Sequence, residues 1–400
     1  MLKGKTVAPL TLGCKVNQYE TDGMIELLKE AGMTAVSFEE KADVYLINTC
    51  SVTNMADKKS RQMIHRAKKL NPDAVVIAAG CYVQAAKDKL MEDDRISITI
   101  GNNKKKDIVQ ILEDYLEIGV TDEGMFDIAA EKEYEPLTIN STLEHTRAYV
   151  KIQDGCNQFC SYCIIPYVRG RIRSRELASI TEEVERLAQT GVKEIVLTGI
   201  HISSYGKDKE NEVGLADVID AISKIESIER IRLGSLEPGI ITDTFIDRIV
   251  DNKKVCPHFH LSLQSGCNTV LKRMNRKYTC EEYFEKCEML RKAFDRPALT
   301  TDVIVGFPGE TDEEFQETVD YLTKLNLYEM HIFKFSPRQG TVAAGMRDQI
   351  GPEIKNQRSD VLLALSEKNK HAYEASFRGE TLEVLIEEKV RRNGKDGYRG

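Results

Sequence analysis

Hydrophobic and polar positions alternate between two kinds of segment along the first third of the chain. Short apolar runs rich in β-branched residues predict strands at 7–12, 44–47, 74–79 and 96–100. Amphipathic stretches predict helices at 17–31, at 53–70, after residue 79 and at 105–118. Strand and helix in alternation are typical of an α/β fold, here an open parallel sheet with helices on both faces. We expect this N-terminal domain to span residues 1–136.

The alternation resumes in a second region, over residues 140–372. Strands are predicted at 149–152, 194–197, 231–233, 259–263, 301–305 and 331–335. Helices are predicted at 180–189, 215–225, 243–250, 280–293 and 313–325. Six βα units fall short of the eight that close a barrel, so the pattern predicts a partial (β/α)6 barrel. The acidic stretch at 129–136 is expected to be a linker.

The end of the chain shows a third pattern. Residues 352–377 predict a helix and residues 382–386 a strand. A lone strand is not a stable unit. We therefore expect residues 373–400 to be the beginning of a small β domain that is cut short.

Composition narrows the class of protein. The 400 residues are 41% hydrophobic and 30% charged, with no apolar run of membrane-spanning length and no signal-peptide core at the start. Ten cysteines without the spacing of a secreted domain favour the reducing cytoplasm. A net charge of -8 argues against indiscriminate nucleic-acid binding. The basic helix at 53–70 could still be either a solvated face or a phosphate-binding surface.

The strongest chemical signal is a set of three cysteines, Cys156, Cys160 and Cys163, spaced C-x3-C-x2-C after the strand at 149–152. We call them the loop triad. Three such thiolates can hold a cuboidal iron–sulfur cluster and leave its fourth iron without a protein ligand, as catalytic metal sites do. The alternatives are a zinc knuckle with a distant fourth ligand and three unrelated thiols, although zinc motifs usually repeat C-x2-C or add histidines.

Three further cysteines, Cys14, Cys50 and Cys81, each follow a predicted strand of the first domain, and Gly13 and Gly80 precede two of them. We call them the sheet triad. The carboxyl ends of parallel strands share one edge of the sheet, where ligands bind, so these residues could converge on a second cluster. The alternative is three ordinary buried cysteines.

Small and polar residues follow the later strands of the second region. The candidate contacts to a nucleoside-like ligand across the barrel mouth are Gly199, Ser235, Glu237, Gln264 and Gly306. Glycines would let the backbone approach such a ligand closely, although ordinary turns also explain them.

Other reactive residues have plainer interpretations. Cys256, His258 and His260 could suggest zinc, but alternate spacing is also what a strand produces. Cys280 and Cys287 lie on one helical face and are expected in the core. Four alternating arginines favour an anionic partner, either phosphates or a cofactor carboxylate; they are Arg169, Arg171, Arg173 and Arg175.

Through these motifs the chain resembles the radical S-adenosylmethionine (SAM) enzymes, and more narrowly the methylthiotransferases. In the larger class, the cysteines matching the loop triad hold a 4Fe-4S cluster whose open iron chelates SAM. The sheet triad matches three cysteines that hold an auxiliary 4Fe-4S cluster in methylthiotransferases. The resemblance covers nearly the whole chain and implies that residues 373–400 begin a TRAM-like RNA-binding domain.

Two segments look most like the branch that acts on N6-threonylcarbamoyladenosine in tRNA: LGCKVNQYE at 12–20 and IIPYVRG at 164–170. The branch acting on isopentenyladenosine usually has Gln-Met-Asn after its first cysteine, and the branch acting on a ribosomal-protein aspartate has Pro-Lys-Asn. This chain has Lys15, Val16 and Asn17 there.

The resemblance implies transfer of a methylthio group to C2 of N6-threonylcarbamoyladenosine at position 37 of tRNA. The loop-triad cluster would reduce SAM to give a 5′-deoxyadenosyl radical that takes hydrogen from C2, and the sheet-triad cluster would carry the sulfur that a second SAM methylates. The implied partners are the tRNA anticodon stem-loop and an electron donor such as flavodoxin or ferredoxin, in the cytoplasm and away from membranes.

The alternatives are methylthiolation of isopentenyladenosine or of a ribosomal-protein aspartate, or a non-catalytic iron–sulfur electron carrier. A carrier would need every cluster corner ligated and no cofactor pocket. The sequence leaves the oligomeric state open.

Overall fold

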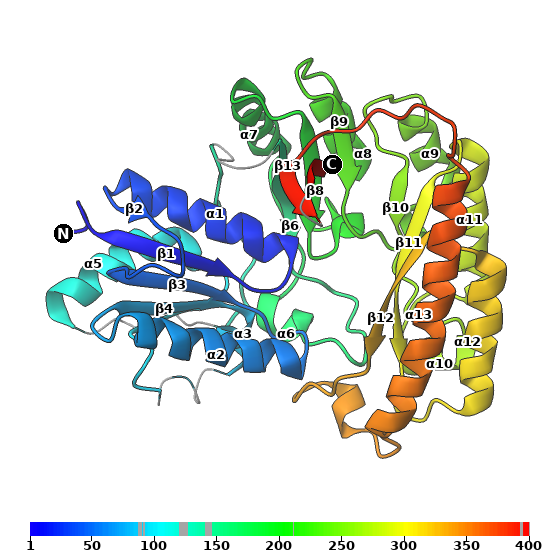
Figure 1. Cartoon of the computed structure of the whole chain (residues 1–400), viewed down its shortest axis with the longest axis horizontal. Helices are drawn as coiled ribbons and strands as arrows, with labels where there is room; N and C mark the ends of the chain where they lie inside the picture. Colours follow the sequence, from blue (N-terminus) through cyan, green and yellow to red (C-terminus); the bar gives the residue numbers. More distant parts are fainter. Residues whose placement is uncertain are drawn as a thin grey trace.

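The computed structural model describes residues 1–86, 90, 93–119, 127–140, 146–210, 212–392 and 395–399. Two α/β bodies lie side by side, a flat sheet with its helices from the N-terminal part and a curled sheet with helices outside it (Figure 1). The predicted fold class is confirmed, including the small antiparallel sheet at the end of the chain.

The N-terminal sheet is parallel, with strand order β2-β1-β3-β4-β5. Its strands are β1 Thr6–Thr11, β2 Thr34–Ala35, β3 Val44–Thr49, β4 Val75–Gly80 and β5 Ile98–Ile100. Its helices are α1 Lys15–Glu30, α2 Asn54–Leu70, α3 Cys81–Ala85 and α5 Ile108–Ile118, with a 3₁₀ turn η1 at Lys105–Asp107. The short strand β2 was not predicted, because two residues carry no periodicity.

Helices cover both faces of this sheet. Successive residues of its central strand, β3, are apolar and point alternately to one face and to the other. Tyr45 and Ile47 pack into one hydrophobic cluster with α2, and Val44 and Leu46 pack into another with α1 and α5. Alternation of side chains along a strand places the two sets on opposite faces. The carboxyl edge of the sheet is therefore left for the loops that follow β1, β3 and β4.

The second body is a partial barrel of parallel strands. In order they are β6 Arg147–Asp154, β8 Glu194–Gly199, β9 Arg230–Leu233, β10 His258–His260, β11 Ala298–Val305 and β12 Glu329–Lys334, with β7 Arg173–Ser174 antiparallel at the edge beside β6. Isolated parallel bridges such as Leu236 with Leu261 connect the β9 and β10 sides into one curled layer. The helices are α6 Ile165–Arg169, α7 Leu177–Gln189, α8 Leu215–Ser223, α9 Asp243–Ile249, α10 Asn268–Arg273, α11 Cys280–Ala293, α12 Asp312–Leu325 and α13 Pro352–Ala375; the 3₁₀ turns are η2 Ile202–Ser204, η3 Pro238–Ile240 and η4 Val342–Gly345.

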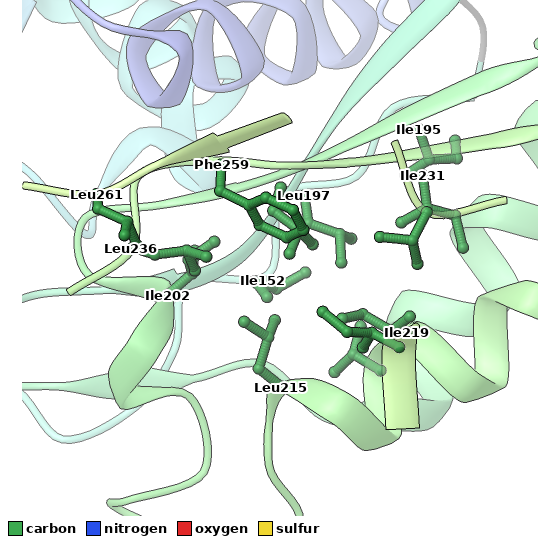
Figure 2. Close-up of a cluster of buried hydrophobic side chains, with 14 of the residues drawn as sticks. Ile152, Ile195, Leu197, Ile202, Leu215, Ile219, Ile231, Leu236, Phe259 and Leu261 are labelled. Atoms are coloured by element: carbon green, nitrogen blue, oxygen red, sulfur yellow. The ribbon is translucent and has the colours of Figure 1, made fainter. Parts of the chain in front are cut away.

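The barrel core lies between the strands and their outer helices. Ile195 and Leu197 of β8 pack with Phe259 of β10 and with Leu215 and Ile219 of α8 (Figure 2). The alternate strand positions, among them Thr198, Arg232 and His260, point to the concave side. Charged and polar groups therefore line the inside of the partial barrel, where a ligand would lie.

Residues 129–136 are irregular, as expected of a linker, but they pack between the two bodies. Tyr134 donates its hydroxyl to the Lys151 carbonyl at 2.8 Å. Glu135 is buried and accepts the Lys106 amide at 3.0 Å. This stretch is therefore part of the seam and not a free connector.

The strand predicted at 382–386 is wrong. That segment has no ladder partner, and Leu382, Val384 and Ile386 are exposed. The ladder starts at β13 Glu388–Arg392, which pairs antiparallel with β14 Lys395–Arg399. A strand needs a neighbour for its backbone groups, and β14 supplies one for β13. None of the described helices is long and apolar enough to span a membrane.

Candidate functional site

The sheet triad lies at the carboxyl edge of the N-terminal sheet. Cys14 precedes α1, Cys50 follows β3 and Cys81 begins α3. Gly13 has φ +98°, and a Cβ there would lie 2.7 Å from Cys50 Sγ. The charges of Cys14 and Cys81 both act on Cys50, so the three thiols form one group.

Asn17 holds the loops of this triad together. Its Nδ2 donates to the Leu12 carbonyl at 2.7 Å and to the Thr49 carbonyl at 2.9 Å. Its Oδ1 accepts from Arg169 Nη2 at 2.7 Å. One buried amide thus links the loop after β1, the loop after β3 and the barrel.

The loop triad follows β6 directly. Gly155, at φ +70°, could not be another residue, since a Cβ would lie 1.7 Å from the Arg171 carbonyl oxygen. The loop is then fastened from α10 and beyond: Ser161 N–H donates to the Met274 carbonyl at 3.0 Å, and Asn275 Nδ2 donates to the Phe159 carbonyl at 2.9 Å. These contacts therefore hold the backbone of the loop triad in place without a ligand.

Each triad has an arginine directed at a sulfur. Arg276 Nη1 lies 3.3 Å from Cys160 Sγ, and Arg169 Nε lies 3.3 Å from Cys81 Sγ. Burial raises the pKa of Cys156 to about 11 and of Cys163 to about 12. These thiols would be neutral near pH 7 on their own, whereas a bound metal deprotonates them and the guanidinium groups then stabilise the thiolates.

The spacing of the sulfurs bears on which metal group fits. A single zinc ion holds sulfurs about 2.3 Å from itself, hence about 4 Å apart. Among the described residues, the ligand atoms of neither triad all lie within 4.8 Å of one another. A cuboidal cluster binds one thiolate at each iron and keeps them further apart. Both triads fit a cluster better than a lone ion.

The sheet triad contacts the segment that follows the loop triad. Cys81 packs with Ile164 and Val168, which follow the loop triad. A cavity of about 210 Å³ opens between the two bodies. Its walls come from the loop after β3, from the loop triad and from β11 and β12: Val52, Thr53, Tyr162, Cys163, Ile164, Ile165, Gln264, Asp302, Ile304, Phe333, Lys334, Phe335 and Ser336.

Among the expected cofactor contacts, Gln264 lines this cavity and Glu237 lies beside the loop triad. Gln264 lines the cavity at φ +79°. Glu237 accepts from Gln158 Nε2 at 2.6 Å and lies 2.9 Å from His201 Nε2. Despite burial, its pKa is lowered by His201 and by Arg276. It therefore remains a carboxylate beside the loop triad.

The other expected contacts are placed differently. Gly199 packs on β6, where a Cβ would lie 2.9 Å from the Gln153 carbonyl oxygen, and Ser235 is exposed. Gly306 faces α13, where a Cβ would lie 2.3 Å from Lys355 Cγ. None of the three is among the described residues that line the cavity.

The alternating arginines were expected to meet an external anion, and for three of them this is wrong. Arg169 binds Glu20 and Asp154, and Arg173 also lies 3.8 Å from Asp154. Arg175 pairs with Glu183. These carboxylates come from other elements, so no spacing in the sequence could reveal them. Arg171 is exposed and stacks on Phe159 at 4.5 Å.

No pattern in the sequence pointed to Arg338, which lies in the loop after β12. Its Nη2 donates to Ser51 Oγ at 2.8 Å and to Asp57 Oδ2 at 2.6 Å, and its Nη1 donates to Asn54 Oδ1 at 2.7 Å. These partners follow Cys50. Arg169 near β6 and Arg338 after β12 thus fasten the N-terminal body to both ends of the partial barrel.

A further group of polar side chains, which no sequence pattern indicated, lies inside the barrel. His260, Asp302 and His331 have ligand atoms within 4.8 Å of one another, and His260 Nδ1 lies 3.0 Å from Thr300 Oγ1. Two imidazoles and a carboxylate could hold a divalent ion or share a proton. The described Cys256 and His258 do not belong to this group. Cys280 and Cys287 are buried, as expected of core residues.

Comparison with known families divides the chain at the same two bodies. Residues 150–322 match the model described as "Radical SAM superfamily". Residues 6–101 match the one described as "Uncharacterized protein family UPF0004".

Curated relatives match almost the whole chain. The Bacillus subtilis protein named "Threonylcarbamoyladenosine tRNA methylthiotransferase MtaB" is 44% identical over 385 residues, which are 96% of this chain and 85% of that protein. The Thermoanaerobacter pseudethanolicus protein named "tRNA-2-methylthio-N(6)-dimethylallyladenosine synthase" is 38% identical and covers 94% of this chain and 81% of its own length.

Among solved structures, the radical SAM methyltransferase TsrM from Kitasatospora setae, with cobalamin and a 4Fe-4S cluster bound, has a TM-score of 0.62. It is 14% identical and the match covers 85% of this chain and 77% of that chain. At this identity the likeness concerns the fold alone.

Proposed function

This chain belongs to the methylthiotransferases of the radical SAM superfamily, and we propose that it transfers a methylthio group to C2 of N6-threonylcarbamoyladenosine at position 37 of tRNA. The observation that carries the proposal is the contact between the two triads' segments: Cys81 packs with Ile164 and Val168, just after the loop triad, and Cys163 lines a cavity together with Val52 and Thr53, just after Cys50. The relative in Bacillus subtilis, at 44% identity, is named for this substrate.

The loop triad would hold the 4Fe-4S cluster that binds SAM. When bound, the clusters and SAM supply the radical and the sulfur-transfer chemistry. The protein supplies position and charge: Gly155 shapes the loop, Arg276 lies 3.3 Å from Cys160 Sγ, and Glu237 offers a carboxylate at the mouth of the barrel. A carboxylate there suits the amino group of SAM or its ribose hydroxyls.

The sheet triad would hold the second, sulfur-bearing cluster. Cys14, Cys50 and Cys81 come from three loops that Asn17 and Arg169 connect to one another. Because Arg169 also belongs to α6, directly after the loop triad, the spacing between the two clusters would be set by one buried side chain. A fixed separation lets both act on the same base without a domain movement.

The proposed macromolecular partners are the tRNA anticodon stem-loop and a one-electron donor such as flavodoxin or ferredoxin. Helix α2 begins four residues after Cys50, and its buried residues Ser60, Ile64 and Ala67 leave a basic face outward. That face carries exposed Lys58, Lys59, Arg61, Arg66 and Lys69. Cations beside the cavity would contact RNA phosphates.

Two measurements test the proposal. Anaerobically reconstituted protein should bind about eight irons per chain, and about four when either triad is changed to alanine. Mass spectrometry of tRNA nucleosides from a deletion strain should show loss of the methylthio group from threonylcarbamoyladenosine and its return on complementation. Loss from isopentenyladenosine instead would assign the other tRNA branch. Intact tRNA profiles would favour a ribosomal-protein substrate, and a loaded protein that does not cleave SAM would favour an electron carrier.

A further inference from the structure

His201 lies between the carboxyl end of β8 and the 3₁₀ turn η2. Its backbone N–H donates to Gln153 Oε1 at 2.7 Å, and its carbonyl accepts the Ser204 N–H at 2.8 Å. The next residue, Ile202, packs in the barrel core (Figure 2). The backbone of His201 is therefore fixed on both sides.

The ring of His201 joins the segment after β8 to the segment after β9 through Glu237. Its Nε2 lies 2.9 Å from Glu237 Oε2, and its Nδ1 contacts Ser204 Oγ. An ionised carboxylate only accepts hydrogen bonds, so Nε2 carries a proton whether Ser204 donates to Nδ1 or accepts from it. His201 and Glu237 are each only 14% exposed, so little water competes for this contact. His201 is therefore a fixed donor to Glu237.

Glu237 is linked in turn to two cysteines of the loop triad. Its Oε2 accepts Gln158 Nε2 at 2.6 Å, and the Gln158 backbone N–H donates to Cys156 Sγ at 3.4 Å. Its Oε1 lies 3.3 Å from Nη2 of Arg276, and Nη1 of the same guanidinium lies 3.3 Å from Cys160 Sγ. A group bound to Glu237 would therefore lie one residue away from two of the three loop-triad sulfurs.

One oxygen of Glu237 keeps room for a ligand. Oε2 accepts from both His201 and Gln158, whereas the contact given for Oε1 within the described chain is the Arg276 guanidinium at 3.3 Å. A carboxylate oxygen can accept two hydrogen bonds. Glu237 is also one of the residues that line a cavity of about 530 Å³ among the loops after β8 and β9. Its carboxylate thus has an unused acceptor site and an open side.

The ligand expected at this place carries matching donors. On the proposed function, the loop-triad cluster holds SAM, and the amino group of SAM bears N–H groups. A carboxylate is a strong acceptor for such donors, provided that it is held in the right orientation. His201 and Gln158 supply that orientation from opposite sides of the strand ends, one from the barrel and one from the loop triad itself.

We propose that His201 is a positioning residue of the SAM site, holding Glu237 so that its Oε1 accepts from the amino group of SAM. This inference rests on the proposed function, because it needs SAM at the loop triad. His201 itself does not touch SAM and acts through Glu237. Its loss should therefore weaken a ligand that has the amino group and spare one that lacks it.

The test measures the binding of two ligands to the reconstituted protein by titration calorimetry without reductant. The ligands are SAM and an analogue of SAM in which hydrogen replaces the amino group. His201→Leu should weaken SAM about tenfold, as expected when a charged group loses one hydrogen bond, and leave the analogue unchanged. His201→Gln should keep most of the wild-type affinity for SAM, because its side-chain amide can still donate to Glu237.

His371→Leu is the matched control. His371 Nε2 also lies 2.9 Å from a carboxylate, that of Glu367, but this pair is exposed on α13. The control should change neither affinity. If His201→Leu loads less iron than wild type, His201→Asn carries the same test, because the shorter amide ends before the position of Nε2.

Two results would overturn the role of His201. Equal weakening of SAM and the analogue in His201→Leu would show that His201 only supports the fold, and an unchanged affinity for SAM would show that it does not position Glu237. The proposed function is judged apart from this, by methylthiolation of threonylcarbamoyladenosine in RNA. If wild type binds SAM in the expected pattern but transfers no methylthio group, the proposed function is wrong and the role of His201 stands.

Discussion

Arg169 Nε lies 3.3 Å from Cys81 Sγ, so a residue at the end of α6 touches a cysteine at the start of α3. The same guanidinium binds Glu20 through Nη1 at 2.8 Å and Asn17 through Nη2 at 2.7 Å. Arg169 and Glu20 are both fully buried. These contacts of Arg169 hold the two halves of the site at a fixed separation.

Replacing Arg169 by Met should remove iron from the sheet triad and destabilise the protein. The change leaves Glu20 and Asp154 buried with fewer counter-charges, which costs about 3–5 kcal/mol for a broken buried pair. Iron per chain and the thermal midpoint measure the two effects. Arg171→Met is the control, since Arg171 is exposed. Normal iron content and a normal midpoint in Arg169→Met would show that this network does not support the triad.

Arg338→Met should loosen the other end of the seam without emptying either triad. Arg338 binds Ser51, Asn54 and Asp57 and, together with Ser336, which accepts the Asn54 backbone amide at 3.1 Å, links the loop after β12 to the start of α2. Amide hydrogen exchange over residues 51–57 should become faster, while iron content stays unchanged. The exposed Arg347→Met serves as control. Unchanged protection of this segment would contradict the role of Arg338.

Gly155→Ala should abolish the loop-triad cluster and spare the other. The new Cβ would lie 1.7 Å from the Arg171 carbonyl oxygen, so the backbone must move. Gly191→Ala is a matched control: Gly191 has φ +94° with nothing within 4 Å, so it bears only the conformational cost of about 1–2 kcal/mol. Iron should fall by about half in the first variant alone, together with SAM cleavage. Equal losses of iron in both variants would mean that backbone strain, and not the steric clash, removes the cluster.

His258 should make the protein less stable as the pH falls. Burial and then the Arg232 charge lower its pKa to about 4, against about 6.5 when unfolded. Because the folded pKa is depressed, stability is complete above about pH 6.5 and is lost as the unfolded chain takes up protons below it. Between pH 7 and pH 5, the free energy of unfolding of His258→Gln should therefore rise by about 1–2 kcal/mol relative to that of wild type. Denaturant unfolding at both pH values measures the difference; a constant difference would refute it.

Much of the fold could be predicted from the sequence, because strands and helices produce local patterns of apolar and polar residues. The apolar run at 44–47 lies within β3, and the basic amphipathic stretch at 53–70 corresponds to α2. The segment at 382–386 misled for the same reason, since local alternation predicts a strand whether or not a partner exists. A strand forms only beside a neighbouring strand, and the described part of the chain supplies none for residues 382–386.

The six cysteines were also identified from the sequence, because a short ligand spacing and the position after a strand are both local features. Their use as cluster ligands stays a proposal. The placement of Gly306 against Lys355, by contrast, follows from the packing of α13, which lies almost fifty residues further along the chain.

The sequence by itself determined the class of fold, the family resemblance and the cysteines that any cluster would need. Only the tertiary structure decided what surrounds them: that Arg169 reaches Cys81, and that its counter-charges are Glu20 and Asp154. Charge pairing acts over a few ångströms of space and carries no mark at its distance in sequence.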